Sequence, residues 1–314
     1  MKKISFILFI IICIIQFLFP GKIDPDKIFE NIKIYQIKDK KGFINYYLLP
    51  SEKENKQKNL IIYIDGSSTA SCLGIKDKNT WKTATLTTFL RLYFNKKYDI
   101  LVPDKYNIDF GKNYKRTDKK IMKYYTIEDR VQGSLKCIDE FLKNNIEYQN
   151  CYMLGISEGS IIMPKIYNNL QNKGRIKKII LCSHGGLSQY ECFKIQYEFY
   201  NPVYKNDLKN IDKIVEDIKK NQNSLTKMYL GWPYKRWADF MFYKPINDII
   251  KIDIPILVIH GDKDINAPVE SSRFIKEEFD KKRKTNLSYK EYKDRDHAFN
   301  EDFEFLVKEI ENWL

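Results

Sequence analysis

Short runs of apolar residues recur along the chain, and turn-forming or charged residues bound most of them. Runs of this length that are rich in β-branched and aromatic residues predict β-strands. The expected strands cover residues 32–37, 43–49, 60–64, 98–102, 151–154, 178–182, 256–259 and 287–292. Lys40-Lys41-Gly42 lies between the first two, which predicts a hairpin. The later runs are almost wholly apolar, as expected for parallel strands that are buried on both faces.

Longer segments with helical spacing separate the later strands. The expected helices cover residues 81–94, 127–143, 159–170, 269–279 and 303–314. Thr126 is a candidate N-cap for the second of these helices, and Asn300 or Asp302 for the last. This order predicts an α/β fold in which helices cover both faces of an eight-stranded, mostly parallel sheet that is antiparallel at its start.

The alternation of strand and helix breaks between Ser183 and Pro255. This stretch is mostly helical in pattern and rich in aromatic side chains. They are Tyr190, Phe193, Tyr197, Phe199, Tyr200, Tyr229, Trp232, Tyr234, Trp237, Phe240 and Tyr243. The sequence therefore predicts one domain over residues 21–314, with a helical cap inserted at about residues 187–250.

The first twenty residues differ from the rest of the chain. Lys2 and Lys3 precede an uncharged and mainly apolar run over residues 4–19, a pattern typical of an export signal. The run is shorter than the roughly 20 apolar residues of a membrane span, and no small-x-small cleavage site follows it. Residues 1–20 are expected to be either a cleaved signal or a retained anchor that associates with a membrane. Either places the folded domain outside the cytoplasm, as a secreted, periplasmic or membrane-anchored protein.

The formal net charge of the chain is +13, which could suit an anionic surface. The lysines are scattered among Asn, Ile and Tyr along the whole chain, with no dense arginine-rich block and no nucleic-acid motif. We expect a solvated lysine surface and no nucleic-acid partner. Five cysteines follow the N-terminal segment without a C-x-x-C pair, so neither a metal site nor a cofactor is indicated.

A G-x-S-x-G pentapeptide, Gly155-Ile156-Ser157-Glu158-Gly159, lies between an apolar strand and an apolar helix. In this context it predicts a nucleophile elbow, a sharp turn that exposes the serine hydroxyl at a helix N-terminus. The alternative is a serine that happens to lie between two glycines in an ordinary turn. The strand and helix on either side favour Ser157 as a nucleophile.

Serine needs a base to act as a nucleophile, and the chain has three histidines. His297 lies in a polar loop between the last expected strand and the C-terminal helix, and it is the candidate base. His260 ends a strand and opens a turn with Gly261, which favours a structural role. His184 follows another strand, where it either lines a pocket or makes local hydrogen bonds.

A carboxylate is needed to orient the base, and the loop after the strand 256–259 offers Asp262 and Asp264. The segment His260-Gly261-Asp262-Lys263-Asp264, followed by Pro268, resembles the acid loop of α/β-hydrolases. This resemblance assigns the triad acid to Asp264, with Asp262 as the second choice. The chain order serine, aspartate, histidine is similar to that family too.

The resemblance covers roughly residues 30–314, and it implies an oxyanion hole made by the backbone amides of Ser67 and Glu158. Asp65 stands where many relatives have histidine, and an acid beside the hole would oppose negative charge unless it is paired. Glu158, beside the nucleophile, is unusual as well. The residues expected to contact the substrate are Asp65, Gly66, His184, Trp232 and Trp237.

The resemblance implies acyl transfer to water through an acyl-enzyme. An aromatic cap with no obvious acidic cluster for a free amine favours a carboxylic ester, including a thioester or a lipid-like ester. One alternative is a serine exopeptidase of the prolyl-oligopeptidase or iminopeptidase type. Another is a non-catalytic binding protein with the same fold. The expected partner is a small-molecule or acyl substrate, and the sequence predicts no oligomeric state.

Overall fold

The computed structural model describes residues 31–314 except 52–57, 78–79, 84–85, 95–96 and 200–209. The expected export segment, residues 1–20, lies outside the described residues. In the part of the chain that is described, no helix combines the length and apolarity required to cross a membrane.

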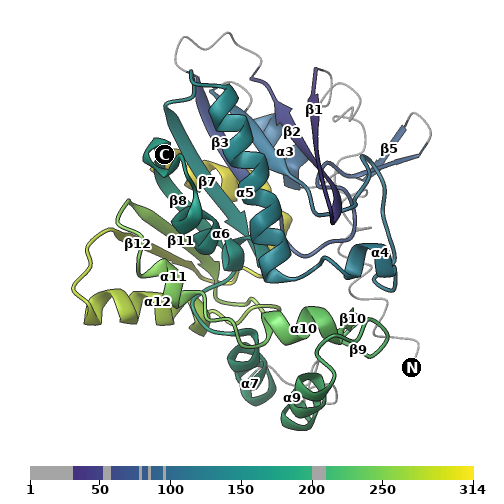
Figure 1. Cartoon of the computed structure of the whole chain (residues 1–314). Coiled ribbons are helices and arrows are strands. Elements are labelled where there is room, and N and C mark those ends of the chain that lie inside the picture. The colour runs from purple at the N-terminus through teal and green to yellow at the C-terminus, as the bar shows by residue number, and fades with distance from the viewer. Residues whose placement is uncertain (1–30, 52–57, 78–79, 84–85, 95–96, 200–209) are drawn as a thin grey trace.

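Eight strands form one sheet, as predicted. They are β1 Lys33–Asp39, β2 Gly42–Leu49, β3 Asn59–Ile64, β6 Tyr98–Pro103, β7 Asn150–Ile156, β8 Ile176–Cys182, β11 Ile256–Gly261 and β12 Leu287–Tyr292. Their order across the sheet is β1-β2-β6-β3-β7-β8-β11-β12 (Figure 1). β1 pairs antiparallel with β2, and β2 with β6, while all further pairs are parallel. The expectation of an antiparallel start is confirmed.

The described helices are α3 Leu86–Phe94, α4 Lys119–Met122, α5 Ile127–Asn144, α6 Glu158–Asn169, α7 Gln189–Phe199, α9 Ile211–Lys220, α10 Tyr234–Phe240, α11 Ile246–Ile249, α12 Glu270–Lys281 and α13 Phe303–Trp313. Two N-caps follow the expected pattern. The Thr126 hydroxyl accepts a hydrogen bond from the amide of Asp129, and the Asp302 carboxylate accepts one from the amide of Phe305. Four expected helices agree with α5, α6, α12 and α13 to within two residues at each end.

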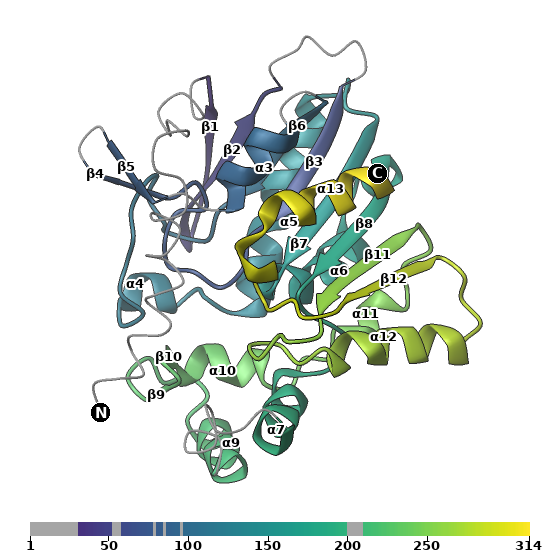
Figure 2. The same ribbon diagram turned by 180° about the vertical axis from the view of Figure 1, so that it is seen from behind.

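The sheet divides the core into two layers because successive side chains of a strand point to opposite faces. Leu60, Ile62 and Ile64 of β3 face a core that they share with α5, α6 and α12. Ile61 and Tyr63 face a second core that they share with α3 and α13. Figures 1 and 2 show these two helix groups on opposite faces of the sheet. Burial on both faces explains why the central strands are apolar throughout.

Helices α7, α9 and α10 lie together at one end of the sheet (Figures 1 and 2). They belong to the long connection between β8 and β11, where the sequence predicts a cap. A short hairpin of β9 (Met228–Tyr229) and β10 (Trp232–Pro233) lies beside α10. Trp237 packs against Phe193 and Tyr229, and these aromatic residues are part of the same apolar core as the residues of α5 and α6.

The expected helix over residues 81–94 is wrong in its first part. Thr80–Thr83 forms β5, which pairs antiparallel with β4 (Ile75–Asp77), and the helix begins at Leu86. Two of the four residues of β5 are threonine, whose branched Cβ favours the extended conformation. The apolar spacing of Leu90 and Phe94, both buried in the core, marks the part that is helical.

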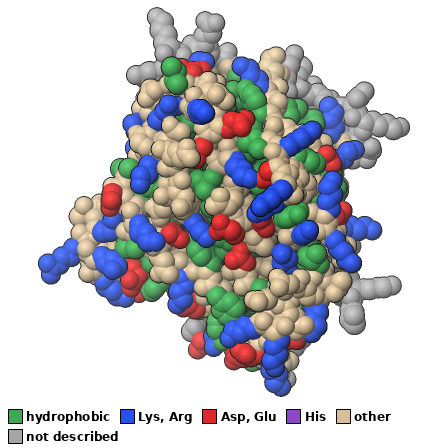
Figure 3. Space-filling model, viewed as in Figure 1, with side chains coloured by type: hydrophobic (Ala, Val, Ile, Leu, Met, Phe, Trp, Pro, Cys, Tyr) green, Lys and Arg blue, Asp and Glu red, His purple; other side chains and the backbone are tan. Residues whose placement is uncertain are grey.

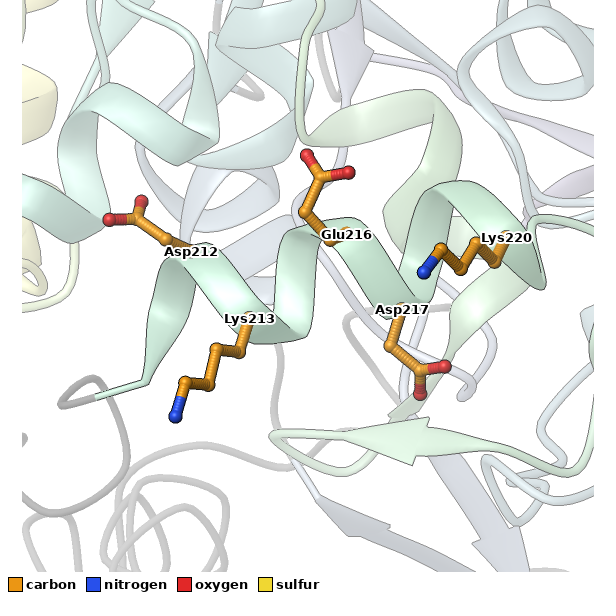
Figure 4. A pocket seen from close by; sticks show the side chains of 5 residues that line it. All are labelled: Asp212, Lys213, Glu216, Asp217 and Lys220. Carbon is orange, nitrogen blue, oxygen red and sulfur yellow. The ribbon is translucent and has the colours of Figure 1, made fainter.

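Charged side chains are interspersed on the face of the molecule that Figure 3 shows, with lysines and arginines lying among acidic groups. A shallow surface depression lies along α9, lined by Asp212, Lys213, Glu216, Asp217 and Lys220. Figure 4 shows that these side chains leave the helix in different directions. The depression holds no residue that the sequence singles out for chemistry, so the candidate site is built from the strand ends instead.

Candidate active site

Ser157 lies in the sharp turn between β7 and α6, as the pentapeptide predicts. Its backbone has φ 55° and ψ −121°, a conformation that non-glycine residues rarely adopt. The turn depends on close backbone contact with β3. A Cβ at Gly159 would lie 2.0 Å from the carbonyl oxygen of Ile64, so only glycine fits there. The residues around Ser157 thus hold it in a strained conformation at the start of a helix.

The structure brings Ser157, His297 and Asp264 together. The Ser157 Oγ lies 3.1 Å from His297 Nε2, and His297 Nδ1 lies 2.7 Å from Asp264 Oδ2. Because Nδ1 faces a carboxylate, it carries the proton in the neutral ring, and Nε2 is left to accept the proton of the serine hydroxyl. The Ser183 hydroxyl donates a 3.0 Å hydrogen bond to the carbonyl of His297, which holds the histidine loop in place.

The carboxylate of Asp264 is fully buried and accepts four hydrogen bonds. The amides of Asn266 and Ala267 donate to Oδ1 at 2.9 and 2.8 Å, while His260 Nε2 and His297 Nδ1 lie near Oδ2. Asp262 instead accepts a hydrogen bond from the amide of Asp294, away from His297. Of the two acids in the loop, Asp264 is therefore the one in contact with the base.

Electrostatics favour a charged aspartate beside a basic histidine. Burial by itself raises the pKa of Asp264, but His297 and His260 outweigh it and hold the pKa well below its usual range. Burial by itself lowers the pKa of His297, and the Asp264 carboxylate outweighs this effect and raises the pKa above its usual value. The ring is therefore a stronger base than a free histidine.

The other two histidines make local hydrogen bonds. His260 Nε2 faces two acceptors, Asp264 Oδ2 and the carbonyl of Ala267, both at 3.0 Å, and its Nδ1 lies 2.6 Å from the Ser272 hydroxyl. His260 thus supports the acid. His184 Nδ1 accepts a 2.8 Å hydrogen bond from the amide of Gly185, and burial lowers its pKa to about 4. Its contact with substrate stays a prediction.

The loop expected to supply an oxyanion donor lies against the nucleophile. A Cβ at Gly66 would lie 3.4 Å from the Ser157 Cβ. Within the described part of the chain, the amide of the next residue, Ser67, has no hydrogen-bond partner. The amide of Glu158 lies in the first turn of α6, where N–H groups point out of the helix. Both amides are thus close to Ser157 in the chain or in space, and their role as donors stays a prediction.

Each of the two acids beside this loop is paired with basic side chains. Asp65 lies 2.7 Å from the Lys105 ammonium, and the buried Glu158 carboxylate forms ion pairs with Arg130 and Arg236. Burial alone would raise the pKa of Glu158, but the two arginines lower it to about 2. The acids that looked unfavourable in the sequence are therefore neutralised.

Arg130, Arg236 and Lys105 are the site residues that sequence reasoning missed. The signal for them was the presence of Asp65 and Glu158 themselves, since buried acids require partners. Nothing in the sequence says which of the many basic residues fills that role.

Trp232 and Trp237 are each 5% exposed and pack within the protein. The Arg236 guanidinium lies 4.4 Å from the ring centre of Trp232 and 4.5 Å from that of Trp237. Trp237 Nε1 also donates a 2.6 Å hydrogen bond to the carbonyl of Tyr229. These contacts give both rings a structural role, and their contact with substrate stays a prediction.

Solved structures share this architecture. An acylaminoacyl peptidase from Pyrococcus horikoshii matches with a TM-score of 0.58 and 14% identity over 87% of this chain and 38% of its own. Est1E from Butyrivibrio proteoclasticus matches with a TM-score of 0.57 and 14% identity over 89% of this chain and 96% of its own. An α/β fold family hydrolase from Bacillus anthracis str. Sterne matches with a TM-score of 0.52 and 13% identity over 90% of this chain and 99% of its own. The chain has the α/β-hydrolase fold.

The sequence comparisons cover less of this chain than the structural ones. The dienelactone hydrolase family matches residues 238–307, a segment that contains Asp264 and His297 but not Ser157. No curated protein matches the sequence. The chain spans less than half the length of the acylaminoacyl peptidase chains that it resembles in fold.

The arrangement has the parts needed for acyl transfer in an α/β-hydrolase. A serine hydroxyl faces a histidine, the histidine faces a buried carboxylate, and two backbone amides lie beside the serine. In the described ranges, no group of three or more His, Cys, Asp or Glu side chains could hold a metal ion.

Proposed function

We propose that this α/β-hydrolase is a serine hydrolase that cleaves carboxylic esters. The observation that carries the proposal is the continuous hydrogen-bonded chain from the Ser157 hydroxyl through His297 to Asp264, with distances of 3.1 and 2.7 Å. Serine is activated in this way when a base within hydrogen-bond reach is itself oriented by a third group.

The proposed reaction has two steps. In the first, Ser157 Oγ attacks the ester carbonyl while His297 Nε2 takes its proton, and the amides of Ser67 and Glu158 stabilise the oxyanion. The same histidine then protonates the departing alcohol, which leaves an acyl-serine. In the second step His297 removes a proton from water, the resulting attack releases the acid, and Ser157 recovers its proton. Asp264 stays ionised throughout and stabilises the imidazolium.

The environment of the site favours an ester over a peptide with a free amine. A protonated amino group requires an available carboxylate, but Asp65 is paired with Lys105 and Glu158 with two arginines. An exopeptidase remains the second candidate, supported by the likeness of the fold to an acylaminoacyl peptidase. A small panel of p-nitrophenyl esters and aminoacyl p-nitroanilides separates the two, and faster turnover of the anilides would favour the exopeptidase.

Labelling with a fluorophosphonate probe tests the hydrolase proposal directly. The wild type should react at one residue, and Ser157→Ala and His297→Ala should not react. Ser288→Ala is a matched control, because Ser288 lies on the edge strand β12 and is not one of the proposed catalytic residues. Its hydroxyl accepts a hydrogen bond from Trp313 Nε1. Equal labelling of Ser157→Ala and wild type, or no reaction of the folded wild type, would overturn the proposal. The second result would favour a binding protein with the same fold.

We further propose that the protein is exported, on the pattern of residues 1–20. N-terminal sequencing of the protein from the cell envelope and the culture medium distinguishes a cleaved signal from a retained anchor. Full-length protein in the cytoplasmic fraction would contradict export.

A further inference from the structure

The carboxylate of Glu158 connects three elements of the fold. It follows the nucleophile directly, its side chain is 3% exposed, and its two oxygens are each paired with a different arginine. Arg130 comes from α5, which covers the sheet, and Arg236 comes from α10, in the inserted region between β8 and β11. The ion-pair group Arg130–Glu158–Arg236 therefore joins the nucleophile helix to the body of the domain and to the insertion.

Arg130 also holds the loop that carries the other proposed oxyanion donor. Its Nη2 donates a 2.8 Å hydrogen bond to the carbonyl of Asp65, and its Nη1 lies 3.5 Å from the carbonyl of Gly66. The Gly66 carbonyl belongs to the same peptide unit as the amide of Ser67. In a trans peptide the N–H and C=O point in opposite directions, so fixing the carbonyl fixes the direction of the N–H. The Arg130 guanidinium thus contacts both Glu158 and the loop that carries the Ser67 amide, the two sources of the proposed oxyanion donors.

The inserted region between β8 and β11 also contacts α5, the helix that carries Arg130. Asp239 of α10 accepts hydrogen bonds from the amides of Ile127 and Glu128, at 2.5 and 3.3 Å. These amides are the first N–H groups of α5, the helix that carries Arg130. Figure 1 shows α10 at the lower end of α5. Helix α10 therefore contacts α5 through Asp239 and contacts Glu158 through Arg236.

The surroundings of Arg236 indicate that its position serves Glu158. Its guanidinium lies 4.4 Å from the ring centre of Trp232, 4.5 Å from that of Trp237 and 4.3 Å from that of Phe240. Its Nε and Nη1 are buried and have no hydrogen-bond partner in the described part of the chain. The ion pair with Glu158 is thus the polar contact that this buried side chain makes, supplemented by its contacts with the aromatic rings.

We propose that Arg130 and Arg236 are positioning residues for the oxyanion hole, which is complete only when α10 is docked on α5 and α6. The ion-pair group orients the amides of Ser67 and Glu158. Two guanidinium groups around one carboxylate also leave a net positive charge behind the hole, which favours the oxyanion of the transition state. The inference rests on the proposed hydrolase function and assigns a catalytic consequence to the docking of the insertion.

Conservative variants test the proposal. Arg130→Lys and Arg236→Lys keep the charge but lose the planar fork that bridges several acceptors. We expect kcat for a p-nitrophenyl ester to fall about 10- to 100-fold per variant, with KM changed less than threefold, since misplaced donors act on the transition state. Rates are normalised to the concentration of active sites that a fluorophosphonate titrates, so loss of folded protein does not change the measured kcat. Arg273→Lys, at a surface pair with Glu291, is the matched control and should keep wild-type kcat.

A transition-state analogue separates positioning from general damage. Phenylboronic acid forms a tetrahedral adduct with a catalytic serine, and one of its oxygens occupies the oxyanion hole. Its Ki should rise in the two arginine variants by about the same factor as kcat/KM falls. Asp239→Asn, which weakens the docking of α10 without touching the ion pairs, should change both quantities in the same direction and less strongly.

The outcomes distinguish this inference from the proposed function. If the wild type hydrolyses esters and reacts at Ser157, while both lysine variants keep wild-type kcat and Ki, the inference is wrong and the hydrolase proposal stands. If the folded wild type neither hydrolyses esters nor reacts, the hydrolase proposal itself is wrong. Glu158→Gln gives an independent check if a lysine variant fails to fold. Combined with Arg236→Lys it should cost little more than either change alone, because the residues act as a unit.

Discussion

Two buried carboxylates flank the machinery around Ser157, and they are held in different ways. Asp264 accepts four hydrogen bonds, two from amides of its own loop and two from histidines. Glu158 is held by the side chains of two arginines that lie 28 and 78 residues away in the chain. The first carboxylate is surrounded by groups that leave its charge available to the base, and the second is neutralised by an excess of positive charge.

The difference explains how, in the proposed mechanism, acids can lie beside a site that stabilises an anion. A carboxylate that assists catalysis keeps its charge, while one that would oppose the oxyanion is paired with cations. Asp264 depends on loops that follow adjacent strands of the sheet, whereas Glu158 depends on contact between the sheet domain and the insertion. Substitutions at the two positions should therefore affect activity and stability in different proportions.

The largest effect is expected for Asp264→Asn. The amide cannot hold the His297 tautomer that places the proton on Nδ1 or stabilise the imidazolium, so kcat should fall by about 10⁴-fold, as found for triads of this type. Steady-state ester hydrolysis at high enzyme concentration measures the loss, and thermal unfolding should show that the fold is kept. A loss of less than tenfold would mean that Asp264 is not the triad acid.

Glu158→Leu should lower stability as well as activity, because the ion-pair group both holds the elements together and positions the proposed oxyanion donors. The substitution removes the shared partner of two buried guanidinium groups, and breaking a buried ion pair by removing one partner costs about 3–5 kcal/mol. Urea unfolding measures the change. Glu291→Leu removes the partner of the exposed Arg273 and should cost at most about 1 kcal/mol. Equal costs for the two variants would contradict a special role for the ion-pair group.

The pH dependence of kcat/KM should reflect the raised pKa of His297. The base must be neutral to accept the serine proton, so activity rises as pH increases through this pKa, and the midpoint should lie above the usual value of 6.5. In Asp264→Asn the carboxylate is gone while the burial remains, so the midpoint should move to lower pH. A midpoint that is unchanged in this variant would show that another group sets the pKa.

The smallest effect is expected for Asp262→Asn. This side chain accepts a hydrogen bond from the amide of Asp294 and does not contact His297, and an amide oxygen can accept the same bond. We expect kcat/KM within about twofold of wild type, since the bond lies outside the triad. A large loss here together with a small loss for Asp264→Asn would reverse the assignment of the acid.

Much of the fold follows from patterns that are local in the sequence. The apolar runs predict all eight strands of the main sheet. The signal is clearest for the central strands, because strands buried on both faces admit few polar residues, whereas the edge strands β1 and β12 are partly exposed. The helix expected to begin at Trp81 begins at Leu86, because β-branched residues favour an extended start there. For the insertion the sequence predicted a helical cap, but not the short hairpin of β9 and β10 within it.

The sequence by itself determined the nucleophile elbow, the histidine loop and the acid loop as candidates, because each depends on a short segment at the end of a strand. The resemblance of the acid loop already favoured Asp264 over Asp262, and the tertiary structure shows that Asp264 is the carboxylate in contact with His297. It alone paired Glu158 with Arg130 and Arg236. A short loop can be recognised from the residues next to one another in the sequence. The partners of a buried ion pair lie far apart in the chain, and only the packing of the elements that carry them brings them together.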